Sequence, residues 1–195
     1  MGVIAVKFGG SSVADAAQIR KTKNIVLSCS DRRYVVVSGP GKRSDEDEKV
    51  TDLLYRYQEL VSTGAKSDAA EVFSAIEKRF TELKEGLGVD TDISSALEEA
   101  AADLAAGASA DRAASCGEFL NAQLIADFYG FDFVDAAGLV LFAEDGTFLA
   151  EETNAALASE LARHERAVIP GFYGAMPDGS LKTFSRGGSD ITGAL

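Results

Sequence analysis

The amino-terminal part of the chain contains the pattern that most restricts its fold: two short apolar runs separated by an amphipathic stretch. The runs lie at residues 3–8 and 34–37, and residues 13–27 have helical periodicity. A strand, a helix and a second strand in this order form a βαβ unit with parallel strands and a right-handed crossover. Such sheets bind ligands at the carboxyl ends of their strands, so we expect a site near Lys7 and Ser38.

The first apolar run ends in Lys7-Phe8-Gly9-Gly10-Ser11-Ser12, which supplies a cation and two residues without side chains. At such a turn the backbone amides can approach an anion closely, because no Cβ intrudes. A second string of this kind, Ser185-Arg186-Gly187-Gly188-Ser189-Asp190, follows another strand-like run. A single Gly-Gly pair is more common in ordinary loops, but the two strings together predict two anion-binding turns.

A helical insertion is predicted at about residues 46–128, where the apolar period changes to 3.6 and no strand pattern occurs. Breaks at Gly64, Gly86-Leu87-Gly88 and Gly107 divide it into four helices. For most of its residues we expect a solvated helical layer without chemistry of its own.

Strand patterns return after Gly130, at residues 131–136, 139–142, 147–149 and 167–171. Hairpin turns are predicted at Glu144-Asp145-Gly146 and Pro177-Asp178-Gly179. Between them, Thr153-Asn154 is expected to cap a short helix that runs through Arg163.

The composition suits one globular domain, since 46% of the 195 residues are hydrophobic. Acidic residues outnumber Lys and Arg by 31 to 19, which gives a net charge of −12. This charge disfavours nonspecific binding to nucleic acid or to an anionic membrane, so small molecules and proteins are the expected partners.

The two cysteines, Cys29 and Cys116, lie far apart without C-x-x-C spacing, so neither a metal site nor a redox site is expected from them. There is no signal-peptide pattern and no apolar run of about 20 residues, which predicts a cytoplasmic protein.

Common nucleotide and hydrolase motifs are missing. Gly39-Pro40-Gly41-Lys42-Arg43-Ser44 fails as a Walker loop, because Arg43 stands where Ser or Thr is needed and Val36 where the first glycine is needed. No G-x-S-x-G occurs, and the single histidine, His164, lies on a charged helix, which disfavours a Ser/His triad.

Six short blocks occur along the chain in a fixed order. They are Lys7-Phe8-Gly9-Gly10-Ser11-Ser12-Val13-Ala14, Val36-Val37-Ser38, Val50-Thr51-Asp52-Leu53-Leu54, Ser115-Cys116-Gly117-Glu118, Pro170-Gly171-Phe172-Tyr173-Gly174 and Arg186-Gly187-Gly188-Ser189-Asp190. Together they resemble the aspartokinases of the amino acid kinase family. The resemblance implies a three-layer α/β/α sandwich around a mainly parallel sheet, with a helical insertion.

The same resemblance implies an activity: transfer of the γ-phosphoryl group of ATP to the β-carboxylate of L-aspartate, with Mg²⁺, giving 4-phospho-L-aspartate. This is the first step of lysine, threonine and methionine biosynthesis. Residues 1–195 would form the amino-acid-binding and phosphoryl-transfer part, and we expect the nucleotide-binding part and the ACT domains to be absent. The complete enzyme is expected to be a homo-oligomer.

For the phosphoryl group, the resemblance implies that Lys7 neutralises charge and that the amides of Gly9 and Gly10 contact the moving group. Ser11 would help at the same turn, and Asp190 would orient Lys7. The reaction joins two anions, so positioned donors are expected to supply most of the catalysis.

For aspartate, the resemblance implies that Arg186 binds the α-carboxylate through its planar fork and that Glu118 holds the α-ammonium. A carboxylate on the Ala- and Phe-rich segment around Glu118 is costly to bury without a cation. Thr51, Phe172 and Ser189 would complete the pocket, with Ser38 beside the reaction path. Thr51 could equally be an ordinary helical residue, and Phe172 ordinary core packing. No metal-ligand set is predicted.

Two alternatives stay open at the level of sequence. A kinase of the same family could act on glutamate, acetylglutamate or carbamate, although the helical insertion and the Glu118 block favour aspartate. A non-catalytic chain could instead bind an amino acid or a subunit. Whether this length of chain turns over ATP alone also stays open.

Overall fold

A four-stranded parallel sheet forms the centre of the computed structural model, which describes residues 2–185 and 187–195. Its strands lie in the order β1 (Ile4–Phe8), β2 (Arg32–Val37), β4 (Ala167–Pro170) and β3 (Asp132–Phe133). Every neighbouring pair is parallel, which confirms the βαβ opening and the mainly parallel sheet.

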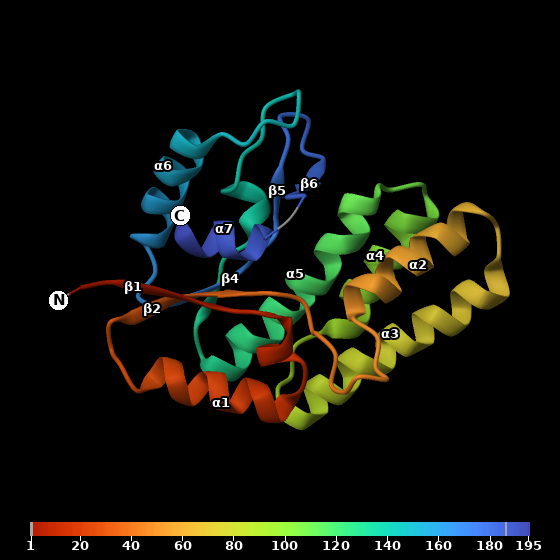
Figure 1. Ribbon diagram of the computed structural model, residues 1–195, viewed down its shortest axis with the longest axis horizontal. Coiled ribbons are helices and arrows are strands. Elements are labelled where there is room, and N and C mark those ends of the chain that lie inside the picture. Colours follow the sequence, from red (N-terminus) through yellow and green to blue (C-terminus); the bar gives the residue numbers. More distant parts are fainter. Residues whose placement is uncertain (1, 186) are drawn as a thin grey trace.

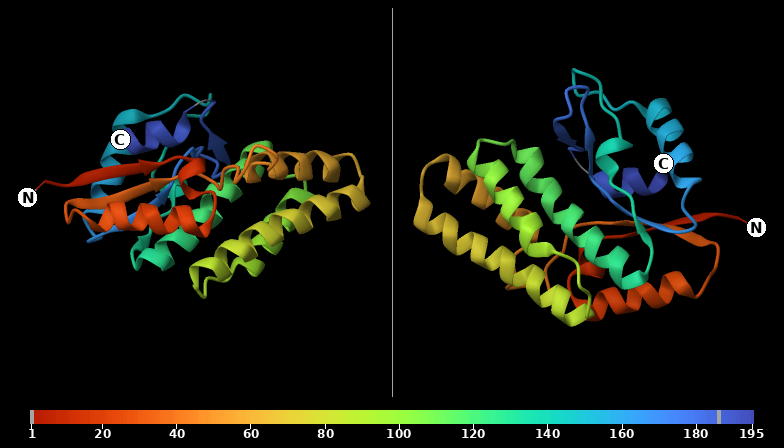
Figure 2. Two further views of the ribbon diagram at one scale, coloured as in Figure 1. Left: turned by 60° about the horizontal axis from the view of Figure 1, so that its bottom comes forward. Right: turned by 180° about the vertical axis from the view of Figure 1, so that it is seen from behind.

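Helices cover both faces of this sheet (Figures 1 and 2). On one face, α1 (Ala16–Leu27) and α5 (Ala110–Tyr129) pack over Val35, Val37 and Val168. On the other face lie α6 (Ala150–Leu161) and α7 (Gly188–Ala194), over Val36 and Ile169. Side chains alternate between the two faces along β2, so neighbouring valines are buried in different cores. The predicted three layers are confirmed.

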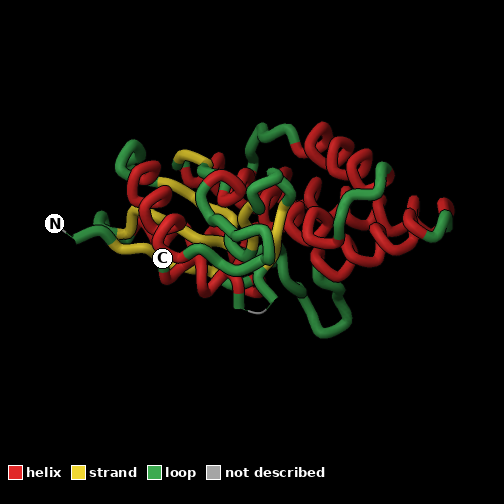
Figure 3. Tube along the Cα trace, turned by 90° about the horizontal axis from the view of Figure 1, so that it is seen from above, coloured by secondary structure: helices red, strands yellow, loops and turns green. Residues whose placement is uncertain are grey.

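The helical layer extends beyond the sheet at the end of the molecule away from both termini (Figure 3). It consists of α2 (Val50–Ser62), α3 (Lys66–Leu87), α4 (Ile93–Ala105) and the first half of α5. Gly64, Gly88 and Gly107 all have positive φ between these helices, so the predicted breaks are confirmed.

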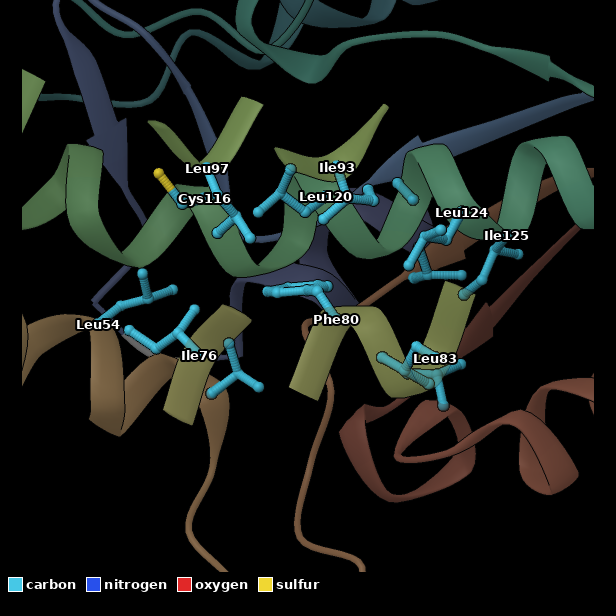
Figure 4. Close-up of a cluster of buried hydrophobic side chains, with 14 of the residues drawn as sticks. Leu54, Ile76, Phe80, Leu83, Ile93, Leu97, Cys116, Leu120, Leu124 and Ile125 are labelled. Atoms are coloured by element: carbon cyan, nitrogen blue, oxygen red, sulfur yellow. The ribbon is translucent and has the colours of Figure 1, made fainter. Parts of the chain in front are cut away.

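One hydrophobic cluster joins the helical layer to the sheet. Phe80 of α3 is fully buried and faces Leu120 of α5, while Ile76 of α3 lies beside Leu54 of α2 (Figure 4). The same cluster includes Val35 of β2. The second half of α5 packs under β3 and β4. Helix α5 therefore belongs to both the helical layer and the sheet.

The region between β3 and β4 differs in part from the prediction. After the short helix η2 (Ala136–Gly138), residues 139–142 and 147–149 form two isolated bridges instead of strands: Phe142 pairs with Phe148 around the predicted turn, and Leu141 pairs in parallel with Ala175. The predicted cap at Thr153-Asn154 is wrong. Helix α6 begins earlier, at Ala150, and the buried Thr153 hydroxyl accepts a hydrogen bond from the Leu141 amide at 3.0 Å.

The second predicted hairpin is confirmed. Strands β5 (Tyr173–Ala175) and β6 (Leu181–Thr183) pair antiparallel, and the Met176 amide donates to the Ser180 carbonyl across the turn at 2.9 Å. Among the described residues, no helix combines the length and the apolar character needed to cross a membrane.

Candidate functional site

The first glycine turn connects a strand to a helix. After β1 ends at Phe8, Gly9 is extended and residues Gly10–Val13 form the short helix η1. The Ser12 amide donates to the Gly9 carbonyl at 2.9 Å. Asp15 then caps α1 by accepting from the Gln18 amide at 2.8 Å. The strand–turn–helix geometry expected for an anion-binding turn is present.

Lys7 lies at this turn and is paired with Asp190. Its Nζ is 2.7 Å from Oδ1 of Asp190, in the first turn of α7. Lys7 also lies close to two glycines. A Cβ added to Gly9 would stand 3.6 Å from the Lys7 Nζ, and a Cβ added to Gly193 would stand 3.0 Å from the Lys7 Cβ. The Asp190 side chain is largely exposed, so the pair faces solvent at the strand end.

Helix α7 also reaches the end of the neighbouring strand. The Ser38 hydroxyl, directly after β2, donates to the hydroxyl of buried Ser189 at 2.9 Å. The Ser38 amide donates to the Phe8 carbonyl at 3.1 Å. Four predicted site residues, Lys7, Ser38, Ser189 and Asp190, are thus brought together at one edge of the sheet.

Glu118 projects from α5 toward the loop after β2 and is buried, with 5% of its surface exposed. Its Oε2 has no hydrogen-bond partner among the described residues, and a Cβ on Gly39 would stand only 3.3 Å from it. Burial raises the pKa of Glu118 to about 7, although the Gly39 backbone opposes the rise. A buried carboxylate without a partner is suited to receive a cation.

Asn121, one turn further along α5, is a site neighbour that the sequence analysis did not identify. Its Nδ2 donates to the Ser38 carbonyl at 2.8 Å, and its Oδ1 has no partner within the described chain. The available signal was an amide side chain in the apolar run Phe119-Leu120-Asn121-Ala122, since a buried amide needs partners.

The segment that fails as a Walker loop packs directly on the first glycine turn. The Gly41 amide donates to the Gly10 carbonyl at 2.9 Å. A Cβ on Gly41 would stand 2.5 Å from the carbonyl carbon of Gly10, and one on Gly10 would stand 3.1 Å from the Gly39 oxygen. Gly10 and Gly41 therefore allow two loops to meet backbone against backbone.

Ser11, Thr51 and Phe172 lie around the site, and within the described residues their side chains form no hydrogen bond to the other site residues. Ser11 is exposed in η1. Thr51 opens α2 beside Gly117, where an added Cβ would stand 3.8 Å from its hydroxyl. Phe172 has φ 78°, unusual for a residue with a side chain, and packs against Gly188. Arg186 lies outside the described residues.

Cys116, two residues before Glu118, is buried and receives a hydrogen bond from Arg112 at 3.0 Å. Burial raises the pKa of its thiol to about 11. In the described part of the chain, no group of three or more His, Cys, Asp or Glu side chains gathers to hold a metal ion.

Comparison with known proteins gives consistent matches along the chain. The model of the amino acid kinase family matches residues 2–195. Aspartokinase 3 of Bacillus subtilis is 37% identical over 97% of this chain and 44% of its own length. Lysine-sensitive aspartokinase 3 of Escherichia coli is 30% identical over 99% of this chain and 45% of its own.

Solved structures agree with the architecture. The crystal structure of Clostridium acetobutylicum aspartate kinase matches with TM-score 0.93 and 41% identity, covering 98% of this chain and 44% of that one. Escherichia coli aspartokinase III, in complex with aspartate and ADP, shares the fold at TM-score 0.80 and 23% identity, over 97% of this chain and 45% of that one. The chain thus spans less than half the length of these relatives.

Proposed function

Because the chain belongs to the amino acid kinase family, we propose that it forms the part of an aspartate kinase that binds L-aspartate and the transferring phosphoryl group of ATP. The complete enzyme would join the γ-phosphoryl group of ATP to the β-carboxylate of L-aspartate, giving 4-phospho-L-aspartate and ADP. This product would enter lysine, threonine and methionine biosynthesis. The matches to aspartokinases at 37% and 41% identity support aspartate as the acceptor.

The observation that carries this proposal is the buried carboxylate of Glu118. An α-ammonium group placed against Oε2 would supply the missing partner and charge. The substrate would then extend from Glu118 toward the Ser38–Ser189 pair, at the strand ends where Lys7 lies. This places its β-carboxylate toward the phosphoryl turn.

At the phosphoryl end, Lys7 would neutralise charge, while the amides of Gly9 and Gly10, with Ser11, would face the transferring oxygens. The contact with Asp190 would hold the Lys7 ammonium in place. The attacking carboxylate is already ionised, so no protein base is required. Lys7, Gly9, Gly10 and Asp190 are the proposed catalytic group.

The rest of the aspartate pocket is proposed from the resemblance and from position. Thr51, Phe172, Ser38 and Ser189 surround the path from Glu118, and Arg186 would bind the α-carboxylate with two parallel hydrogen bonds. Magnesium would neutralise phosphate charge. Its ligands would come mainly from phosphates and water.

We further propose that the nucleotide-binding part and the ACT domains belong to residues beyond this sequence, and that the complete enzyme is a homo-oligomer. The chain covers only 44% and 45% of the two aspartokinases, which supports further residues for nucleotide binding and regulation. We place the protein in the cytoplasm, which the free thiols of Cys29 and Cys116 support.

The test is a calorimetric titration of L-aspartate, with L-glutamate as a control ligand, into a sample that unfolds cooperatively. We expect heat for aspartate only. Glu118→Gln should remove it, whereas Glu98→Gln, on the exposed face of α4, should not. Binding of glutamate alone would indicate a different acceptor. Aspartate binding that survives Glu118→Gln would contradict the assigned site.

A further inference from the structure

Arg79 is the one arginine in α3, and it is buried with 4% of its surface exposed, although a solvated layer was expected for most residues of the helical insertion. Its Nη1 donates to Oδ2 of Asp47 at 2.6 Å. Its Nη2 donates to the carbonyl oxygens of Gly41 and Ala14, the latter at 3.3 Å. One guanidinium of α3 thus connects the turn after β1 with the loop between β2 and α2.

The two carbonyls belong to the loops that meet at the site. Ala14 closes η1, which begins at Gly10, and Gly41 ends the Gly39-Pro40-Gly41 segment. The loops also contact each other through the hydrogen bond from Gly41 to Gly10. Arg79 therefore binds both loops on the side of α3, while their own hydrogen bond joins them near the strand ends.

Arginine suits this place because one rigid fork presents several donors at fixed angles, which a lysine ammonium cannot do. Its charge is compensated by Asp47, which also accepts hydrogen bonds from the backbone and Nε of Arg43 at 2.9 Å. Burial lowers the pKa of Arg79, and Asp47 opposes that change. A buried cation is retained at such a position only when its partners are fixed.

We propose that Arg79 is a positioning residue that holds the Gly9–Ala14 turn and the Gly39–Gly41 segment in register. The amides of Gly9 and Gly10 are thereby preorganised for the phosphoryl group, so the helical layer takes part in catalysis through Arg79. The identity of the ligand rests on the proposed function, whereas the joining of the two loops does not.

The first test measures amide hydrogen exchange in the unliganded chain. Arg79→Met removes all three hydrogen bonds, Arg79→Lys keeps the charge without the fork, and Ile76→Ala is the control. Ile76 lies one turn away, is fully buried and has no side-chain donor for either loop, so its variant lowers stability without removing a hydrogen bond to the loops. We expect the Gly41 amide to exchange at least tenfold faster in Arg79→Met than in Ile76→Ala at matched stability. Equal exchange in these two variants would overturn the proposal.

Arg79→Lys keeps the test decisive if the methionine variant does not fold. It should show the same faster exchange at Gly41, because a single ammonium cannot bind both carbonyls. Full protection of Gly41 in Arg79→Lys would show that charge alone suffices and would overturn the role assigned to the fork.

The second test titrates MgATP into the same variants. Arg79→Met and Arg79→Lys should bind MgATP at least tenfold more weakly than the parent, and Ile76→Ala should bind it as the parent does. Unchanged affinity in the arginine variants would contradict preorganisation. A parent chain that binds aspartate but not MgATP would agree with a nucleotide-binding part beyond this sequence, and one that binds neither would count against the proposed function. In both cases the exchange data at Gly41 would still decide the role of Arg79.

Discussion

At the scale of single residues, Glu118 couples ligand binding to the stability of the fold. Its carboxyl has a pKa of about 7 in the folded chain, against an ordinary value of 4.5. In that window the folded state binds more protons than the unfolded state, so stability is fully present below about pH 4.5 and falls as the pH rises toward 7. An ammonium ligand would remove this cost.

Glu118→Gln should therefore stabilise the unliganded chain at pH 8, by up to roughly 3 kcal/mol at about 1.4 kcal/mol per pKa unit. At pH 4.5 the parent and the variant should differ little, because the parent carboxyl is then protonated when folded. Urea unfolding at the two pH values measures the difference, with Glu98→Gln as control. If Glu118→Gln stabilised the chain equally at both pH values, the titration assigned to Glu118 would be contradicted.

Phe172 allows a second prediction, because its φ of 78° is costly for any residue with a Cβ. Phe172→Ala and Phe172→Gly both remove the ring, but only glycine relieves the backbone. The glycine variant should be more stable than the alanine variant by about 1 kcal/mol. Thermal unfolding of the pair checks this, and an alanine variant that is equally stable would mean that the loop relaxes to negative φ.

At the scale of elements, the contact between the two glycine loops limits what either loop can accommodate. Gly41→Ala places a Cβ 2.5 Å from the Gly10 carbonyl carbon, so the loops must separate at a cost of about 1–3 kcal/mol. Gly138→Ala, with nothing within 4 Å of its added Cβ, should change stability by less than about 0.5 kcal/mol. Chemical denaturation of both variants tests this. Equal losses would contradict the backbone contact.

The sequence predicted those elements whose signals are local. The βαβ opening followed from apolar period and length, and the breaks at Gly64, Gly88 and Gly107 followed from the need for positive φ. The position of Thr153 was wrong, because its hydroxyl meets a distant amide instead of the start of its own helix. A capping rule considers only neighbouring residues, so it cannot predict the hydrogen bond from Leu141, 12 residues away.

Within the site, Lys7, Ser38, Ser189 and Asp190 could be grouped from strand ends and motif order, and the structure brings them together. Asn121 and Arg79 could not be grouped in this way. Asn121 stood out only as an amide in an apolar run, and the loop partners of both residues are backbone carbonyls far along the chain, which any residue type offers. The pair of Arg79 with Asp47 joins side chains 32 residues apart, which no local spacing indicates.

At the scale of the whole molecule, the shared hydrophobic cluster predicts that the helical layer and the sheet unfold together. Phe80→Ala, at a fully buried position of α3, should cost about 3–5 kcal/mol. Hydrogen exchange should show that the Val36 amide of β2 loses as much protection as the amides of α3. Protection that is lost in the helical layer but kept in β2 would show that the two parts unfold separately.

The burial of Cys116 has a practical consequence for following the protein in solution. Its thiol is protonated at neutral pH and is covered by residues of α4 and of the β5–β6 hairpin, so an alkylating reagent can reach it only while α5 is transiently separated from these neighbours. The more accessible Cys29 serves as an internal standard for reagent activity. The ratio of the Cys116 alkylation rate to the Cys29 rate therefore measures how often α5, which also carries Glu118, separates from its neighbours. A lower ratio with L-aspartate would report occupancy of the site without a radioactive or coupled assay.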